Sequence, residues 1–286
     1  MVTLKDYEGG ETAWCPGCGN FQILESIKRA LVRLNLEPYQ VLFVSGIGQS
    51  SKLPHYLKCN FFNGLHGRAL PVASGAKIAN HDLKVIVVGG DGDGYGEGGN
   101  HIIHAIRRNQ DLTYIVHNNQ IYGLTKGQAS PTSEKGFITK TTPSGVILHQ
   151  LNPIALAISL GITFVGRGFS ARVQHLTELI VKGIKHRGFA LIDVLQPCVS
   201  FNRLNTYSWY EKRVYDLGDD EDYDQSDRLA AFKKSQEWDE RIPLGVIYSS
   251  ERPSYEEQVP TLKKCPLIRQ KHDLDRMEKI FEEFIP

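Results

Sequence analysis

The segment Lys84-Val85-Ile86-Val87-Val88-Gly89-Gly90-Asp91-Gly92 carries the clearest indication of the fold. Its first five residues form an apolar run that predicts a buried strand, and Gly90-Asp91-Gly92 follows where that strand ends. A second apolar run, Tyr114-Ile115-Val116, leads in the same way to Asn118-Asn119. Because the loops after neighbouring parallel strands open onto one crevice, we expect both polar loops to line the same site.

The side chains in these two loops predict a site for a hard divalent cation. Asp91 offers a carboxylate and Asn119 an amide oxygen, and Mg²⁺ bound together with a diphosphate is the natural occupant of such a pair. The alternative, that Gly-Asp-Gly is only a turn, leaves the matching second loop without an explanation.

The cysteines indicate a second inorganic site. Cys15 and Cys18 form one Cys-x-x-Cys pair, and Cys59, Cys198 and Cys265 follow singly. The first ten residues are polar and do not resemble a signal peptide, so we expect a cytoplasmic protein in which disulfides are disfavoured. An iron–sulfur cluster held by four cysteines is favoured over zinc, the alternative, because a second Cys-x-x-Cys pair is missing.

Strand and helix patterns alternate along the chain and predict an α/β fold, a mainly parallel sheet flanked by helices. We expect helices at 23–34, 66–79, 98–108, 153–160 and 171–185, strands at 41–44, 84–88, 113–116, 162–165 and 190–195, and a long polar loop at 123–145. Residues 1–215 would form the main domain. Residues 216–286, with helices at 228–241 and 273–284 and a strand at 243–248, would form a C-terminal extension that packs on the domain or on a partner subunit.

Composition excludes several classes of function. The 286 residues carry a net charge of +1, which is not the basic excess of a nucleic-acid-binding protein. Apolar runs are far shorter than the ~18 residues that a membrane span requires. Hydrophobic residues make up 41% of the chain, enough for a substantial core.

Taken together, the motifs resemble those of the β subunits of 2-oxoacid:ferredoxin oxidoreductases, and most closely the 2-oxoglutarate (ketoglutarate) branch. The resemblance runs from about Glu11 to about Tyr210. It is carried by Cys15-Pro16-Gly17-Cys18-Gly19, Ser45-Gly46-Ile47-Gly48, Gly64-Leu65-His66-Gly67-Arg68-Ala69, Gly90-Asp91-Gly92-Asp93, Tyr122-Gly123-Leu124-Thr125-Lys126-Gly127-Gln128 and Gln196-Pro197-Cys198.

The resemblance implies thiamine diphosphate, Mg²⁺ and a 4Fe–4S cluster as cofactors. Asp91, Asn119 and the backbone oxygen of Ile121 would bind Mg²⁺. Asp93 would orient its loop rather than bind the metal. The thiamine cofactor would be bound by a set that includes Asp93: Gly46, Ile47, Gly48, Gly67, Gly90, Gly92, Asp93, Gly94, Leu124 and Thr125.

The reacting end of the cofactor would face His66, for which an ordinary buried histidine is the alternative. Lys52, Arg68 and Lys126 are cations on segments expected near the crevice. The second carboxylate of 2-oxoglutarate needs a cation when it is desolvated, and we expect Lys52 and Lys126 to supply it.

One departure from the family pattern affects the cluster. Many members carry a cysteine directly after Gly-Ile-Gly, where this chain has Gln49. We expect Cys59 to replace it, so that Cys15, Cys18, Cys59 and Cys198 are the ligands and Cys265 is a spare thiol.

The resemblance also implies partners. A larger α subunit would supply the glutamate that activates thiamine, coenzyme A would accept the acyl group and ferredoxin the electrons. The product of 2-oxoglutarate would be succinyl-CoA with CO₂. Alternatives are a pyruvate or broad-range 2-oxoacid enzyme, a non-redox thiamine diphosphate decarboxylase or lyase, and a structural iron–sulfur or zinc subunit without thiamine.

Overall fold

An eight-stranded sheet runs through the computed structural model, which describes residues 1–271 and 274–284. Its strand order is β2-β1-β3-β4-β8-β7-β10-β9, and every neighbouring pair is parallel except β7 with β10. The strands are β1 Val41–Ser45, β2 Asn60–Asn63, β3 Lys84–Gly90, β4 Leu112–Asn118, β7 Phe164–Phe169, β8 Phe189–Leu195, β9 Val214–Asp216 and β10 Ile242–Ser249. The expected α/β architecture with a mainly parallel sheet is confirmed.

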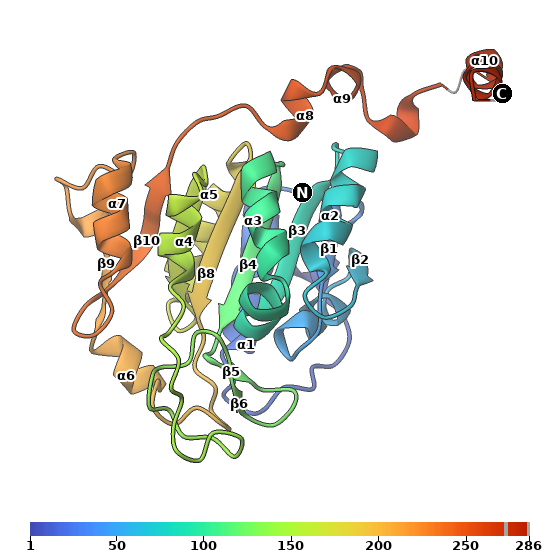
Figure 1. Cartoon of the computed structure of the whole chain (residues 1–286). Helices are drawn as coiled ribbons and strands as arrows, with labels where there is room; N and C mark the ends of the chain where they lie inside the picture. The colour runs from blue at the N-terminus through green and yellow to red at the C-terminus, as the bar shows by residue number, and fades with distance from the viewer. Residues whose placement is uncertain (272–273, 285–286) are drawn as a thin grey trace.

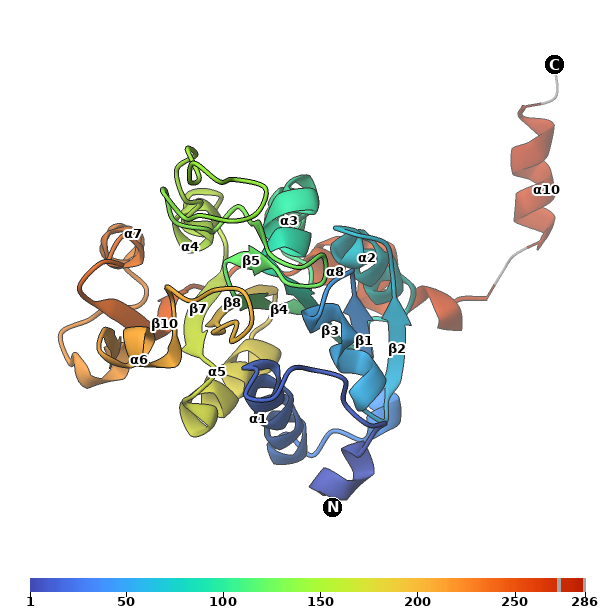
Figure 2. The same cartoon turned by 90° about the horizontal axis from the view of Figure 1, so that it is seen from below.

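Helices cover both faces of this sheet (Figures 1 and 2). On one face lie α1 Asn20–Arg33 and α5 Val173–Lys185, and on the other α2 Ala69–Ala79, α3 Gly99–Arg108 and α4 Pro153–Ser159. Strands covered on both faces are apolar throughout rather than alternating, which explains why the central strands could be recognised from the sequence. Every residue of β4 and β8 is buried.

Two elements begin later than their sequence patterns predict. The helix expected from His66 starts at Ala69, because Gly67 adopts a φ of 71° and the chain turns there first. The strand expected at 162–165 is β7, which includes Gly166 and Gly168. A Cβ atom at Gly166 would lie 2.7 Å from Leu179 of α5, so these glycines let the helix approach the strand. Because glycine has a weak strand propensity, the sequence pattern did not predict that the strand continues through Gly166 and Gly168.

The remaining elements are short. A small hairpin of β5 Ile121–Tyr122 with β6 Gln128–Ala129 encloses the start of the long loop. Further helices are α6 Tyr207–Glu211, α7 Arg228–Ser235, α8 Tyr255–Gln258, α9 Pro260–Lys264 and α10 Leu274–Glu282. Short 3₁₀ helices span Leu4–Tyr7, Pro38–Gln40, Ser50–Tyr56, Leu217–Asp219 and Leu267–Arg269, and a π-helical turn spans Gly92–Glu97.

The segment expected as a C-terminal extension contributes to the central sheet. β10 pairs with β7, and the boundary expected after residue 215 falls inside β9. Residues 272, 273, 285 and 286 of the extension, including the expected start of the last helix at Asp273, lie outside the described residues. No helix within the described ranges is long and apolar enough to cross a membrane.

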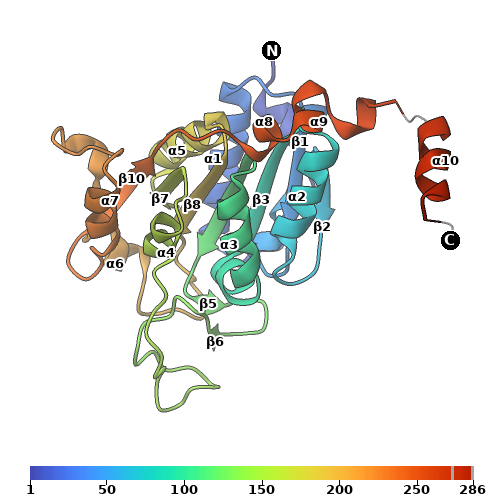
Figure 3. The ribbon, with the colours of Figure 1, turned by 45° about the horizontal axis from the view of Figure 1, so that its top comes forward.

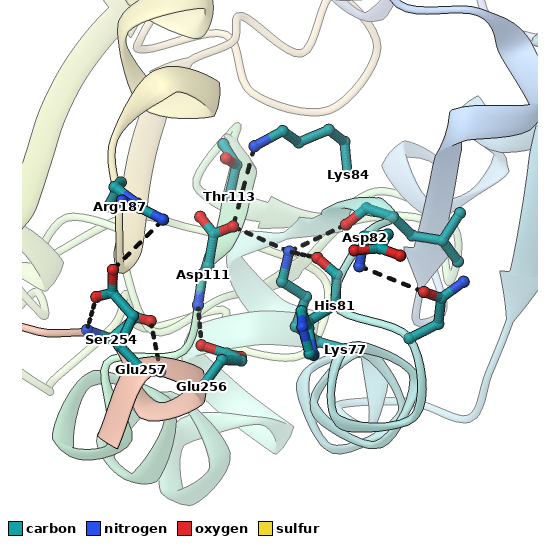
Figure 4. Close-up of polar contacts among 12 residues, drawn as sticks. Lys77, His81, Asp82, Lys84, Asp111, Thr113, Arg187, Ser254, Glu256 and Glu257 are labelled. Atoms are coloured by element: carbon teal, nitrogen blue, oxygen red, sulfur yellow. Dashed lines mark hydrogen bonds and ion pairs between the residues drawn. The ribbon is translucent and has the colours of Figure 1, made fainter. Parts of the chain in front are cut away.

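A polar cluster attaches the segment after β10 to the amino end of the sheet (Figures 3 and 4). Asp111 stands directly before β4. Its carboxylate accepts from the buried Nζ of Lys77 at 2.9 Å, and its backbone N–H donates to Glu256 at 3.3 Å. Arg187 pairs with Glu257 at 3.4 Å. These contacts hold α8 at the amino end of the sheet, on the side of the molecule away from β5 and β6.

Candidate active site

A pocket of about 80 Å³ opens at the carboxyl ends of β1, β3 and β4. The two polar loops that follow β3 and β4 line it together, along with residues from the turn after β1. The lining residues are Ile47, Gly48, Gln49, Ser50, His66, Gly90, Asp91, Gly92, Asp93, Asn119, Ile121, Tyr122, Gly123, Leu124 and Thr125. Larger hollows exist elsewhere, such as one of about 410 Å³ beside α5, so the residues rather than the volume identify this pocket.

Asp91 is the buried carboxylate of the pocket. Its Oδ2 atom accepts hydrogen bonds from the hydroxyls of Ser130 at 2.5 Å and Thr132 at 2.6 Å, and this leaves Oδ1 for another partner. Burial raises the pKa of Asp91 to about 6, and the two hydroxyls oppose that rise. A bound cation would favour the ionised carboxylate further, so the group is suited to a metal.

Asn119 and Ile121 complete a set of oxygen donors. The side-chain nitrogen of Asn119 donates to Gln196 at 3.2 Å, which turns its Oδ1 toward the backbone N–H of Ile121 at 3.1 Å. A carboxylate, an amide oxygen and a backbone carbonyl are the ligands that Mg²⁺ takes in proteins. Asp91, Asn119 and Ile121 therefore fit the expected cation.

Asp93 connects three segments of the site. Its Oδ1 atom accepts from the backbone N–H of Ile47 at 2.9 Å and of Gly67 at 2.7 Å, and lies 2.8 Å from Nδ1 of His66. A Cβ atom at Gly46 would lie 2.1 Å from the other carboxylate oxygen, so only glycine fits there. These contacts join the loop after β3 to the turn after β1 and the turn before α2.

The glycines after β3 are fixed by aromatic neighbours. A Cβ atom at Gly92 would lie 2.2 Å from the ring of Tyr122, and one at Gly94 would lie 2.1 Å from the hydroxyl of Tyr114. Glycine is therefore required at both positions by the packing of the loop as well as for any close approach of a ligand.

Several supporting residues could not be identified from motifs. The Thr132 hydroxyl also lies 2.9 Å from Oδ1 of Asn118, and Asn118 donates to Asp193 at 3.1 Å. Tyr95 donates to the same carboxylate at 2.8 Å. The network is buried, and it reaches Asp91 through the hydroxyl of Thr132. Its only signal in the sequence is the cluster of hydroxyl residues Ser130, Thr132 and Ser133 in the long loop.

The expected cations lie around the pocket rather than in its wall. Lys52 is half-buried in the 3₁₀ helix Ser50–Tyr56, and Lys126 is exposed in a turn with a φ of 75°. Arg68 is exposed and donates to the backbone oxygen of His66 at 2.9 Å. Among the expected catalytic residues, only His66 lines the pocket.

The four cysteines expected as cluster ligands divide into a group of three and one outlier. Gln196 donates to the sulfur of Cys18 at 3.3 Å, and Ser200 donates to that of Cys15 at 3.2 Å, so the loop of Cys198 contacts the Cys-x-x-Cys turn. Burial raises the pKa of Cys18 to about 11, and the neighbouring Cys198 and Cys15 add to the rise.

The outlier is Cys59, which lies beside Tyr7 in the core, where burial raises the pKa of its thiol to about 12. Within the described part of the chain, no three His, Cys, Asp or Glu side chains converge on a single-ion site.

Comparison with known proteins agrees with this geometry. Residues 44–194 match the family "Thiamine pyrophosphate enzyme, C-terminal TPP binding domain". Residues 198–264 match the family of the C-terminal part of the pyruvate ferredoxin oxidoreductase β subunits. The chain is 51% identical over 256 residues to the 2-oxoacid:ferredoxin oxidoreductase subunit beta of Saccharolobus solfataricus, covering 86% of this chain and 84% of that protein. This chain is a 2-oxoacid:ferredoxin oxidoreductase β subunit.

Other proteins similar to this β subunit are named for 2-oxoglutarate. It is 50% identical over 199 residues to the 2-oxoglutarate oxidoreductase subunit KorB of Mycobacterium tuberculosis, covering 69% of this chain and 53% of that protein. Its fold matches the solved 2-oxoglutarate:ferredoxin oxidoreductase from Magnetococcus marinus with a TM-score of 0.91 and 35% identity, over 98% and 96% of the two chains. That structure contains 2-oxoglutarate, coenzyme A and succinyl-CoA. The expected family, fold and enzyme class are confirmed.

Proposed function

We propose that this β subunit binds Mg²⁺ and thiamine diphosphate and, with a larger α subunit, converts 2-oxoglutarate and coenzyme A to succinyl-CoA and CO₂. Electrons would pass through a 4Fe–4S cluster to ferredoxin. The observation that carries the proposal is the pocket that Asp91, Asn119, Ile121 and His66 line together. Bound thiamine diphosphate supplies the carbanion that attacks a 2-oxoacid, and the protein supplies position and charge.

The residues of this chain have distinct roles in the proposal. Asp91, Asn119 and the carbonyl of Ile121 hold the Mg²⁺ that anchors the diphosphate. Asp93 fixes the turn at Ile47 and the orientation of His66. Because the Asp93 carboxylate accepts, Nδ1 of His66 carries the proton, and Nε2 is free to interact with substrate.

The pocket supports a site that is divided between subunits. Its volume of about 80 Å³ is well below the roughly 300–1,000 Å³ of ordinary cofactor pockets, so this chain forms one wall. No glutamate is present among the described lining residues, and the activating glutamate is therefore assigned to the α subunit. Large apolar side chains are exposed near the pocket, on Ile47, Leu65 and Leu124. They suit burial by that partner.

The proposed substrate, 2-oxoglutarate, is chosen on two grounds: the lysines beside the pocket and the names of similar proteins. Lys52 and Lys126 flank the pocket on two segments, and either ammonium group could pair with the second carboxylate of 2-oxoglutarate. The KorB relatives and the solved neighbour are named for 2-oxoglutarate. A broad-range 2-oxoacid enzyme is the second candidate, because the relative at 51% identity is named for 2-oxoacids in general.

The test is a substrate panel on the reconstituted enzyme. The chain is produced with its α subunit, purified without oxygen and assayed with coenzyme A, a viologen dye and single 2-oxoacids. We expect dye reduction with 2-oxoglutarate at a higher kcat/KM than with pyruvate, and none by the β subunit alone. Equal values for both acids would favour the broad-range candidate, and turnover by the isolated β subunit would contradict the divided site.

A further inference from the structure

Three of the four cysteines expected to bind the cluster lie together. Gln196 and Ser200 stand on either side of Cys198 in the sequence, and their side chains donate to the sulfurs of Cys18 and Cys15, respectively. Donors directed at sulfur favour thiolates and tune iron–sulfur clusters. A four-iron cluster spaces its cysteines more widely than a single ion does. The group therefore fits a cluster even though no single-ion site is found among the described residues.

Cys59 lies toward the other end of the sheet. The residue after it, Asn60, pairs with Leu42 at the start of β1, which places Cys59 level with Val41. The turn that leads to the pocket begins only after Ser45, the last residue of β1. Four residues of strand separate these two levels by about 13 Å at roughly 3.3 Å per residue. The thiol of Cys59 packs against the core instead.

Gln49 occupies the position between the cysteine turn and the pocket. Its backbone oxygen accepts a hydrogen bond from the ring nitrogen of Trp14, the neighbour of Cys15, at 2.8 Å. Gln49 also lines the pocket. Its side-chain oxygen Oε1 is buried and has no hydrogen-bond partner among the described residues. A buried oxygen without a partner is costly, and a ligand at this position would remove that cost.

We propose that this chain holds its cluster through only three thiolates, those of Cys15, Cys18 and Cys198, with Gln49 facing the fourth iron. This inference rests on the proposed function in assuming that a 4Fe–4S cluster is bound. An amide oxygen or a water holds iron among sulfides more weakly than a thiolate does. The fourth iron should therefore be the one that is lost on oxidation.

The predicted loss is a balanced redox step. A one-electron oxidant, ferricyanide, takes one electron from a 4Fe–4S cluster of charge 2+ and becomes ferrocyanide. The bonds from the sulfides to the fourth iron break, this iron leaves as Fe²⁺, and a 3Fe–4S cluster of charge 1+ remains on the three cysteines. The parent should lose about one quarter of its cluster iron and gain the EPR signal of a three-iron cluster.

The experiment compares four proteins, each produced without oxygen as the complex with the α subunit. Iron, acid-labile sulfide and EPR are measured before and after ferricyanide, with any cluster on the partner determined from the Cys198→Ser complex. We expect Cys59→Ser to match the parent in iron and sulfide, and Cys198→Ser to lose the cluster. Gln49→Cys, which restores a fourth thiolate, should keep all its iron under the dose that converts the parent.

Two results with the variants would overturn the inference. Loss of the cluster in Cys59→Ser would make Cys59 a ligand, and iron retention by the parent equal to that of Gln49→Cys would show that the fourth iron already has a strong ligand. Thiamine diphosphate content is measured on the same samples. A complex with the cluster but without thiamine would contradict the proposed thiamine site alone, and one with thiamine but without the cluster would contradict this inference together with the proposed electron route to ferredoxin.

Discussion

Nδ1 of His66 lies 2.8 Å from the Oδ1 atom of Asp93 that also accepts the backbone N–H groups of Ile47 and Gly67. One carboxylate oxygen thus joins the turn after β1, the turn before α2 and the loop after β3. The orientation of the only expected catalytic residue in the pocket wall depends on this contact. The packing around Asp93 should therefore affect oxoacid turnover as much as the residues that contact the substrate do.

Gly46→Ala tests that packing. The added Cβ atom would stand 2.1 Å from Asp93, so the loop must shift, at a cost of about 1–3 kcal/mol in unfolding free energy and with loss of oxoacid turnover. Gly75→Ala is the control, because nothing lies within 4 Å of that position in α2 and alanine favours helix. Thermal unfolding and dye-reduction assays of both variants check the prediction. Equal behaviour of the two would show that the Gly46 contact is unimportant.

Thr132→Val tests the support behind Asp91. The variant keeps the shape but removes the hydroxyl that donates to Asp91 and lies within hydrogen-bond distance of Asn118. We expect Mg²⁺ to bind on the order of 10- to 100-fold more weakly, as for other residues that orient metal ligands. Thr132→Ser, which keeps the hydroxyl, should stay near the parent. The measurement is the Mg²⁺ concentration at half-maximal activity, and a parent-like Thr132→Val would argue against the role.

The pH dependence of metal binding follows from Asp91. Its pKa is raised to about 6 by burial, and Mg²⁺ binds only the ionised carboxylate, so protons compete with the metal below that pH. Apparent Mg²⁺ affinity should thus be about tenfold lower at pH 5 than at pH 7. Asp91→Asn carries no proton to lose and serves as the control for titration of the diphosphate itself. Parallel pH profiles for the two proteins would exclude Asp91 as the titrating group.

Substrate selectivity should depend on one of the two flanking lysines. Lys52→Met and Lys126→Met are compared through kcat/KM for 2-oxoglutarate and for pyruvate. A charge-assisted contact is worth ~1.5–3 kcal/mol, which corresponds to roughly a ten- to hundredfold preferential loss for 2-oxoglutarate. Equal losses of kcat/KM for both acids would mean that the lysine contacts the 2-oxo-carboxylate group common to both, or the cofactor. An unchanged kcat/KM for both acids would mean that the lysine has no role in substrate binding.

The sequence predicted the sheet because its central strands are apolar throughout, and it predicted the pocket because Asp91 and Asn119 follow two adjacent strands. It did not predict β7 fully, since Gly166 and Gly168 have weak strand propensity and are required by packing against α5. The role of Ser130 and Thr132 could not be predicted either. These residues reach Asp91 across a loop without periodicity, and only the folded chain brings them together.

The assignment of the pocket to thiamine diphosphate is best tested by the content of this cofactor in the purified αβ complex. Parent complex purified in Mg²⁺ should retain the cofactor in near-stoichiometric amount. Asp91→Ala removes the charged ligand and should retain essentially none, with an unchanged circular dichroism spectrum and unchanged assembly with the α subunit. Cofactor retained by a folded Asp91→Ala complex at the level of the parent would contradict the assignment of this pocket.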